Sequence, residues 1–181
     1  MARIIEIQSF NPDWPRIFHE EAQNVKAVLG PNLLSAHHIG STAVPGLAAK
    51  PIIDILLVVR ALDALDACND TMLRLGYIAK GENGISGRRY FQHLEGDLHL
   101  VHIHAFESGH PEIARHLNFR DYLIAHPQTA QAYQDLKCTL AAQFREGPAD
   151  YTAGKGDFIR LVDERAAAWR SETGPHRRKD R

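Results

Sequence analysis

Several features that would assign the chain to a class at once are scarce or absent. Its two cysteines, Cys68 and Cys138, have no Cys-x-x-Cys spacing, which argues against a disulfide scaffold or a cysteine metal site. No apolar run approaches the roughly 20 residues of a membrane-spanning helix. The start, MARIIEIQSF, has no basic segment that leads into an apolar one, as a secretion signal would. We therefore expect a cytoplasmic protein without a membrane partner.

An excess of positive charge is also missing. Lys and Arg number 21 and Asp and Glu number 22, so the formal net charge is −1. Domains that bind nucleic acid non-specifically carry a strong basic excess, so small ligands are favoured over nucleic acid. The length of 181 residues predicts a single domain at 1–170. The polar tail at 171–181 is expected to be disordered, and the oligomeric state is left open.

The spacing of apolar residues predicts an α/β (α+β) fold, with a mixed β-sheet flanked by helices and followed by a C-terminal helical segment. The sheet-bearing half covers about 1–108 and the helical half about 109–170. Strands are predicted at 3–8, 33–39, 51–59, 77–79, 88–93 and 98–106. Helices are predicted at 13–29, 62–75, 111–125, 128–145 and 155–170.

The stretch HHIGSTAVPGLAAKPIID, residues 37–54, looks like a phosphate-binding loop. It is not a Walker A loop, because five residues separate Gly40 from Gly46 and Leu47 stands where that motif has lysine. A dinucleotide-binding Gly-x-Gly-x-x-Gly pattern is absent as well. The stretch therefore needs another interpretation.

Four residues of this stretch are candidates for binding a phosphate group. Gly40 permits close approach of the backbone to a ligand, and amides that open a helical turn attract anions. The hydroxyl of Ser41 adds a donor, and Thr42 and Lys50 follow in the same loop. An ordinary strand-to-helix turn would also explain Gly40 and Ser41.

Asp54 stands out because it is a lone carboxylate in an apolar strand. Such a charge is costly to bury unless it is paired, hydrogen-bonded or metal-bound. As a structural residue it could bond to backbone amides or to Arg89. As a functional residue it would be a metal ligand and catalytic group, for which it needs further ligands nearby.

Two histidines supply candidates for those further ligands. His102 and His104 alternate on one face of the predicted strand in LHLVHIHAF, so both imidazoles point the same way. They could share a metal ion with Asp54, or one could bind while the other carries protons. Half-buried histidines that only donate and accept hydrogen bonds are the alternative.

Cations in the second half of the chain could neutralise an anionic substrate. His116 and Arg120 lie in the stretch HLNFRDYL, and Lys137 and Lys155 lie on later helices. With Arg89 these side chains would contact the charged part of the substrate. A solvated helix face would account equally well for the charges of HLNFRDYL.

Taken together, the motifs resemble one family. The stretches HHIGSTAVPGLAAKPIIDI, VHIHAF and RHLNFRDYL are similar to the GrpB family, also called UPF0157, over about residues 3–168. The resemblance extends to the C-terminal part at Tyr151, Lys155, Phe158 and Ile159. It implies membership of the nucleotidyltransferase superfamily, and a similar domain is fused to dephospho-CoA kinase in some bacteria.

The resemblance also implies a site and shows a departure from it. In the superfamily pattern a Gly-Gly/Ser element precedes two acids at alternate strand positions, which Gly40, Ser41 and Asp54 match in part. The second acid falls at Leu56, and two-metal phosphoryl transfer needs several carboxylates. His102 and His104 could replace the missing ligands, which favours one transition metal (Mn, Zn, Ni or Fe) over paired Mg²⁺.

Three functions stay open at this point. The first is a nucleotidyltransferase-like transferase acting on a nucleotide or other small phosphorylated molecule with a divalent metal. The second is a non-catalytic module that binds a nucleotide or coenzyme, as the replacement of an acid by Leu56 suggests. The third is a metal-dependent phosphoester hydrolase. Fold-level analogy does not decide among them.

Overall fold

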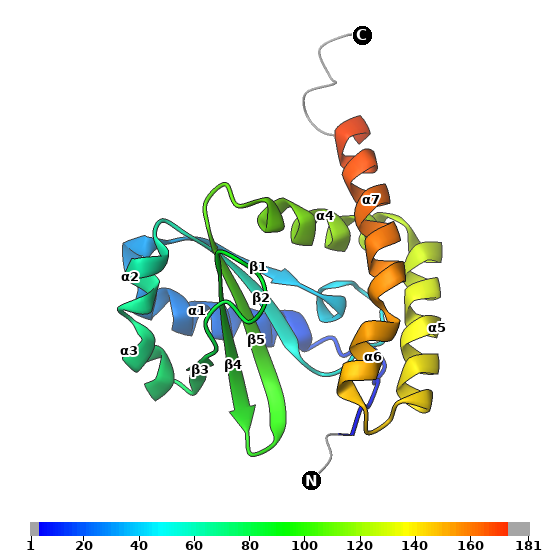
Figure 1. The fold of residues 1–181 in the computed structure, drawn as a ribbon, viewed down its shortest axis with the longest axis horizontal. Coiled ribbons are helices and arrows are strands. Elements are labelled where there is room, and N and C mark those ends of the chain that lie inside the picture. Colours follow the sequence, from blue (N-terminus) through cyan, green and yellow to red (C-terminus); the bar gives the residue numbers. More distant parts are fainter. Residues whose placement is uncertain (1–3, 174–181) are drawn as a thin grey trace.

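The computed structural model describes residues 4–173, which form five strands and seven α-helices (Figure 1). The strands are β1 (Leu33–Ile39), β2 (Ile53–Val59), β3 (Tyr77–Ala79), β4 (Arg88–Glu95) and β5 (Leu98–Glu107). The helices are α1 (Trp14–Leu29), α2 (Leu62–Asp66), α3 (Asn69–Arg74), α4 (Pro111–Ala125), α5 (Pro127–Gln143), α6 (Pro148–Gly154) and α7 (Gly156–Thr173). The predicted class, a mixed α/β sheet followed by helices, is confirmed.

The sheet brings the two polar strands of the predicted site together. Its strand order is β1-β2-β5-β4-β3, with β2 and β5 parallel and the other neighbours antiparallel. Asp54 on β2 lies opposite His102 on β5, and Leu56 lies opposite His104. No local sequence pattern predicts which strands pair, and the structure shows that β2 and β5 are neighbours.

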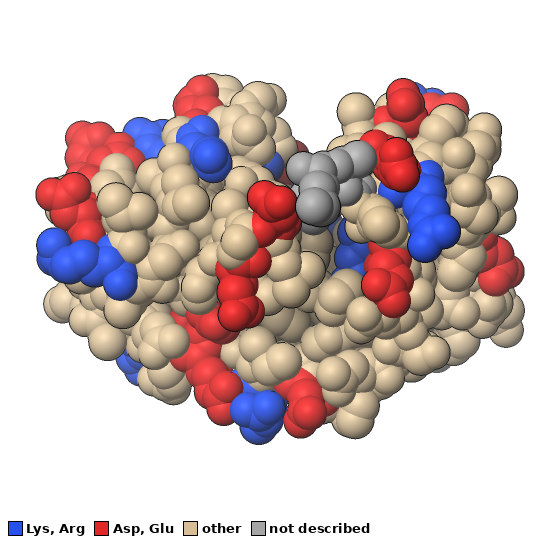
Figure 2. All heavy atoms as spheres, turned by 90° about the horizontal axis from the view of Figure 1, so that it is seen from below, with Lys and Arg blue, Asp and Glu red and all other residues tan. Residues whose placement is uncertain are grey.

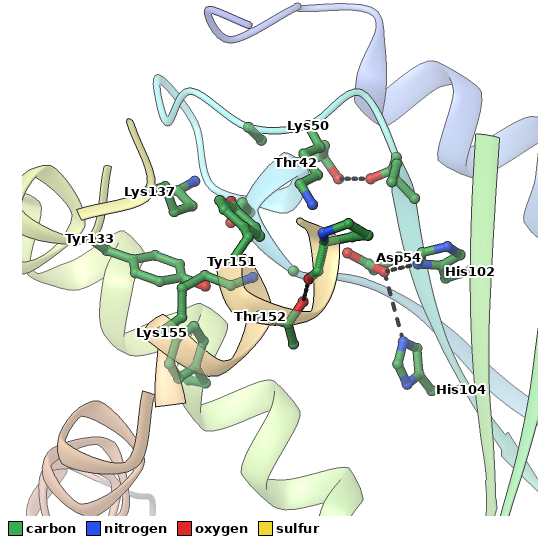
Figure 3. A pocket seen from close by; sticks show the side chains of 16 residues that line it. Thr42, Lys50, Asp54, His102, His104, Tyr133, Lys137, Tyr151, Thr152 and Lys155 are labelled. Atoms are coloured by element: carbon green, nitrogen blue, oxygen red, sulfur yellow. Dashed lines mark hydrogen bonds and ion pairs between the residues drawn. The ribbon is translucent and has the colours of Figure 1, made fainter. Parts of the chain in front are cut away.

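Strand β2 lies at the centre of the core, as its apolar run predicts. Ile53, Ile55 and Leu57 pack with residues of α1, α2 and α3 on one face of the sheet. On the other face Leu56 is fully buried against Ile39 and Phe106, with side chains of α4 around them. Asp54 shares this second face and lies beyond the end of that small cluster, toward α6 (Figure 3).

The loop between β1 and β2 is held against the C-terminal helices. The amide of Ala48 donates to Oε1 of Gln134 at 2.8 Å, and Nζ of Lys137 donates to the carbonyl of Ala48. Both partners lie on α5, one helical turn apart. Helix α5 therefore fixes this loop at the mouth of the site.

Before the C-terminal tail, the predicted and observed elements differ in three places. Residues 4–7 do not join the sheet, because Ile5 bonds to Arg145 and only Gln8 pairs, with Ala49. The helix predicted at 62–75 is divided into α2 and α3 by a turn at Ala67 and Cys68. Helix α6 was not predicted.

The predicted tail begins inside a helix, since α7 continues to Thr173. The prediction of disorder was therefore wrong for 171–173, and 174–181 lie outside the described residues. Among the helices of residues 4–173, none has the length and apolarity needed to cross a bilayer.

Candidate functional site

A cavity of about 390 Å³ lies where the sheet meets the C-terminal helices (Figure 3). The β1–β2 loop, β2, β5, α5 and α6 all contribute to its walls. Of the predicted site residues, it brings together Gly40, Ser41, Thr42, Lys50, Asp54, His102, His104 and Lys155. Lys137, Tyr133, Tyr151 and Thr152 complete the polar lining.

His102 and His104 both lie near the same carboxylate oxygen of Asp54. Its Oδ1 lies 3.4 Å from Nδ1 of His102 and 3.8 Å from Nε2 of His104. Burial alone would raise the pKa of Asp54, but the hydrogen bonds and charges of the two imidazoles outweigh it and hold the pKa well below its ordinary value. Asp54 is therefore an anion.

Gly40 allows the loop to approach this carboxylate. Its φ of 70° is in the left-handed region that favours glycine. A Cβ at this position would overlap Oδ2 of Asp54 and lie 3.0 Å from Cγ. Glycine is thus required by the contact between the turn and Asp54, a reason that the sequence pattern did not specify.

The hydroxyl of Thr42 forms hydrogen bonds with β1 and with the residue that precedes β2. Its buried hydroxyl donates to the carbonyl of Ile52 at 3.2 Å and lies 3.0 Å from Nε2 of His38. Burial, the largest cause, lowers the pKa of His38 to about 4, so this imidazole is neutral near pH 7. Thr42 therefore ties the loop to β1 and β2 as well as lining the cavity.

Three lysines from separate elements surround the cavity. Lys50 precedes β2, Lys137 lies on α5, and Lys155 stands between α6 and α7. Nζ of Lys50 and Nζ of Lys155 lie 3.9 Å and 4.4 Å from the centroid of the Tyr151 ring. These are cation–π distances, so one buried aromatic ring holds two of the three ammonium groups.

Lys137 is the most deeply buried of the three, with 2% of the residue exposed. Its Nζ lies 4.9 Å from the ring centroid of Tyr133. Burial, with a smaller contribution from the charge of Lys155, lowers the pKa of Lys137 to about 8. Burial also lowers the pKa of Lys155. Within the described chain neither Lys137 nor Lys155 has an ion pair with a carboxylate, so their charges are unbalanced.

The lysines are not part of a uniformly basic surface on the face drawn in Figure 2. There Lys and Arg side chains are scattered among Asp and Glu side chains, and the described residues form no continuous basic strip across that face. The concentration of positive charge at the cavity is therefore local.

The structure does not bring Arg89 to the cavity. Adjacent residues of a strand point to opposite faces, so Arg89 lies on the face away from Asp54, His102 and His104. It forms a bidentate ion pair with Asp66, at 2.7 Å from Nε to Oδ1 and 2.7 Å from Nη2 to Oδ2. The expectation that Arg89 would contact the substrate or pair with Asp54 was wrong.

Arg120 also has other partners. Its Nη1 donates to the carbonyl of His38 at 2.9 Å, and its Nε and Nη2 both donate to Asp121. Its side chain fastens α4 to β1 instead of lining the cavity.

His116 cannot supply the predicted positive charge. Burial first, and then the charge of Arg115, lower its pKa to about 3, so the ring is neutral. It packs against His104, with the ring centroids 5.3 Å apart. The sequence pattern correctly indicated proximity to the histidine pair, but the predicted role as a cation was wrong.

Arg88 lies beside His104, one of the three predicted metal ligands. Nη1 of the buried Arg88 lies 3.4 Å from Nδ1 of His104, and a guanidinium can only donate. In residues 4–173 no group of three or more His, Cys, Asp or Glu side chains is arranged to hold a metal ion. The metal site stays a prediction that this geometry does not support.

Two residues of the lining were missed in the sequence. Tyr133 and Thr152 lie on α5 and α6, where neither stands out from a solvated helix face. A signal existed for Tyr133 only in its spacing, since it precedes Lys137 by four residues and so lies on the same helix face. Helix α6 itself was not predicted, so the sequence could not indicate that Thr152 lines the cavity.

The fold and cavity define a class of mixed α/β protein in which a single carboxylate and three lysines line a site between a sheet and C-terminal helices. Residues 4–165 match the family model described as GrpB protein. The chain belongs to the GrpB family, and the resemblance seen in the sequence is confirmed.

Solved and curated relatives agree with this assignment. The crystal structure of GrpB from Enterococcus faecalis is similar with a TM-score of 0.86 and 38% identity, over 91% of this chain and 99% of that one. UPF0157 protein YqkA from Bacillus subtilis is 46% identical over 168 residues, which are 93% of this chain and 49% of YqkA. A protein named dephospho-CoA kinase from Mycolicibacterium paratuberculosis is 31% identical, over 91% of this chain and 46% of its own length. The chain thus spans about half the length of YqkA and of this kinase.

Proposed function

We propose that the protein binds a nucleotide or another small phosphorylated molecule in the lysine-lined cavity. One observation carries the proposal: Lys50, Lys137 and Lys155 surround a cavity whose lining contains one carboxylate, Asp54. Burial lowers the pKa of both Lys137 and Lys155, which form no ion pair with a carboxylate among residues 4–173, and an anionic ligand would offset the cost of burying these two charges. Phosphate groups match such a cluster because each oxygen accepts charge-assisted hydrogen bonds.

The shape of the cavity supports a ligand with an additional uncharged part. Phe119, Tyr133 and Tyr151 contribute aromatic surface to the same lining, and Ser41 and Thr152 contribute hydroxyls. A volume of about 390 Å³ lies in the range of small-molecule sites. A nucleotide or coenzyme fragment combines the charge and the flat apolar surface that this lining would accept.

Transfer of a nucleotidyl or phosphoryl group is the second candidate. The position of Asp54 beside the Gly40–Ser41 turn favours it, because that turn would bring a phosphate close to the carboxylate. The burial of Leu56 in the core opposes a two-metal mechanism, since the second acid would have to stand there. Binding is therefore the primary proposal and transfer the secondary one.

Calorimetry tests the primary proposal directly. Purified protein would be titrated with ATP, UTP, dephospho-coenzyme A and adenosine, where adenosine lacks phosphate. Dephospho-coenzyme A is included because this chain is similar to proteins named dephospho-CoA kinase. We expect at least one phosphorylated compound to bind, adenosine to bind more weakly, and Lys155→Met to weaken binding. Equal binding by Lys155→Met and the wild type would contradict the proposal.

A further inference from the structure

Tyr151 is fixed by packing between the C-terminal helices and the start of the described chain. The residue is 1% exposed and belongs to a buried cluster with Ile5, Leu140 and Ala141. Leu140 and Ala141 lie on α5, and the amide of Ile5 donates to the carbonyl of Arg145, just beyond α5, at 2.8 Å. The Tyr151 ring therefore has little freedom to move.

Helix α6, which carries Tyr151, packs closely on α5. A Cβ at Gly154 would lie 2.6 Å from Cδ2 of Leu140, so a larger residue there would require that side chain to move. Glycine thus permits a closer approach of the two helices than alanine would. This contact helps to hold Tyr151 at the wall of the cavity.

The ring of Tyr151 is a shared contact of two cavity lysines. Nζ of Lys50 lies 3.9 Å and Nζ of Lys155 lies 4.4 Å from the ring centroid (Figure 3). Both distances are well within the roughly 6 Å over which the face of an aromatic ring attracts a cation. Burial raises the pKa of Tyr151 to about 12, so its hydroxyl is neutral near pH 7. The ring, and not a tyrosinate anion, therefore attracts the two ammonium groups.

The ring contact opposes the effect of burial on Lys155. Burial lowers the pKa of this lysine, so it disfavours the ammonium form, whereas the aromatic face favours that form. Lys137 is held in another way, because its Nζ donates to the carbonyl of Ala48.

We infer that Tyr151 is a positioning residue for ligand binding, whose ring fixes the ammonium groups of Lys50 and Lys155 at the cavity before a phosphorylated ligand arrives. The inference rests on the proposed function and assigns to Tyr151 a role that does not require contact with the ligand. A lysine side chain is long and flexible, so it loses much freedom when a ligand orders it. Side chains that are already ordered lose less, and affinity rises accordingly.

Fluorinated phenylalanines at position 151 test the inference, because fluorine withdraws electron density from the ring face and changes the shape of the ring little. Tyr151→Phe and the corresponding mono-, di- and trifluorophenylalanine proteins would be titrated with ATP, UTP and dephospho-coenzyme A in a calorimeter. We expect Tyr151→Phe to bind as the wild type does, since a cation–π contact needs the ring and not the hydroxyl. Affinity should then fall with each added fluorine, by about threefold to thirtyfold over the series.

Two controls separate the charge distribution of the ring from its packing. Urea unfolding should show that every protein of the series is folded. The same fluorinated residues at Phe91, which is buried in the core on the other face of the sheet, should leave the affinity unchanged. A role of Tyr151 in packing alone would give the same affinity throughout the fluorinated series.

The outcomes separate the inference from the proposed function. A wild-type protein that binds none of the three compounds would overturn both. Binding by the wild type with an affinity that stays constant across the fluorinated series would overturn the inference alone. Tighter binding on fluorination would also overturn it, because the ammonium groups would then have to leave the ring to reach the ligand. Loss of binding in Tyr151→Phe would assign the role to the hydroxyl instead of the ring.

Discussion

Replacement of Lys137 by Met should change the dependence of stability on pH. The pKa of Lys137 falls from 10.5 to about 8 in the folded protein, mainly because the side chain is buried. Between pH 8 and 10.5 the unfolded chain therefore binds more protons at this residue than the folded chain does. The free energy of unfolding of the wild type must then rise with pH across this window relative to that of Lys137→Met.

The magnitude follows from the two pKa values. At pH 7 a charged Lys137 costs the folded protein about 3 kcal/mol relative to an unshifted lysine. At pH 9.5 most of that cost is gone, because the buried amine is neutral. Between pH 7 and pH 9.5 the free energy of unfolding of the wild type should therefore rise by about 2 kcal/mol relative to that of the variant. The variant also loses the hydrogen bond from Lys137 to Ala48. This loss changes the difference in free energy of unfolding between the two proteins by a similar amount at every pH, so it has much less effect on how that difference depends on pH.

Urea unfolding at pH 7.0, 8.0, 9.0 and 9.5 measures this slope, with Lys80→Met as the control because Lys80 is exposed. The control should track the wild type at every pH. A difference between Lys137→Met and the wild type that stays constant from pH 7 to 9.5 would refute the reasoning, since it would mean that burial does not weaken the protonated form. A bound phosphorylated ligand should flatten the slope, because an anion beside the ammonium raises its pKa.

Three further predictions concern the rest of the site. Gly40→Ala should lower the free energy of unfolding by about 1–3 kcal/mol more than Gly46→Ala, measured in urea, because both have positive φ but only a Cβ at position 40 meets Asp54. Asp54→Asn should tighten binding of the phosphorylated ligand by about threefold to tenfold in calorimetry, since it removes the one negative charge of the lining; weaker binding would contradict this. His116, with a pKa of about 3, should show no NMR titration between pH 5 and 8, and a titration there would contradict its burial as a neutral ring.

The sequence predicted the sheet and part of the site for identifiable reasons. The alternation of β5 has the period of a strand, and a short apolar run such as that of β2 is typical of a strand buried on both faces. Asp54 and His102 could be recognised because each residue type is unusual where it stands. Their contact depends on β2 and β5 being neighbours, and residues 60–97 of the chain lie between the two strands. No local pattern contains that information.

Arg88 and Arg89 show where sequence reasoning fails. They are adjacent, identical residues at the start of β4, and the pattern did not indicate which of them faces the site. The register of β4 on β5 directs Arg88 toward His104 and Arg89 toward Asp66 on the opposite face. A shift of one residue would exchange them, so their roles are set by the tertiary structure.

Leu56 and Arg88 together determine the charge of the region around His102 and His104. A second acid at position 56 would lie in a cluster with Ile39 and Phe106 that is closed to water, so the sheet gains packing where a metal site needs a carboxylate. With that acid absent, Asp54 is the one carboxylate in the described lining of the cavity, and the buried Arg88 places a positive charge beside His104. A divalent cation placed there would add positive charge beside that guanidinium, whereas an anion near Lys137 and Lys155 would neutralise charges that are already present. The electrostatics of the described residues therefore favour an anion in the cavity over a cation beside Asp54.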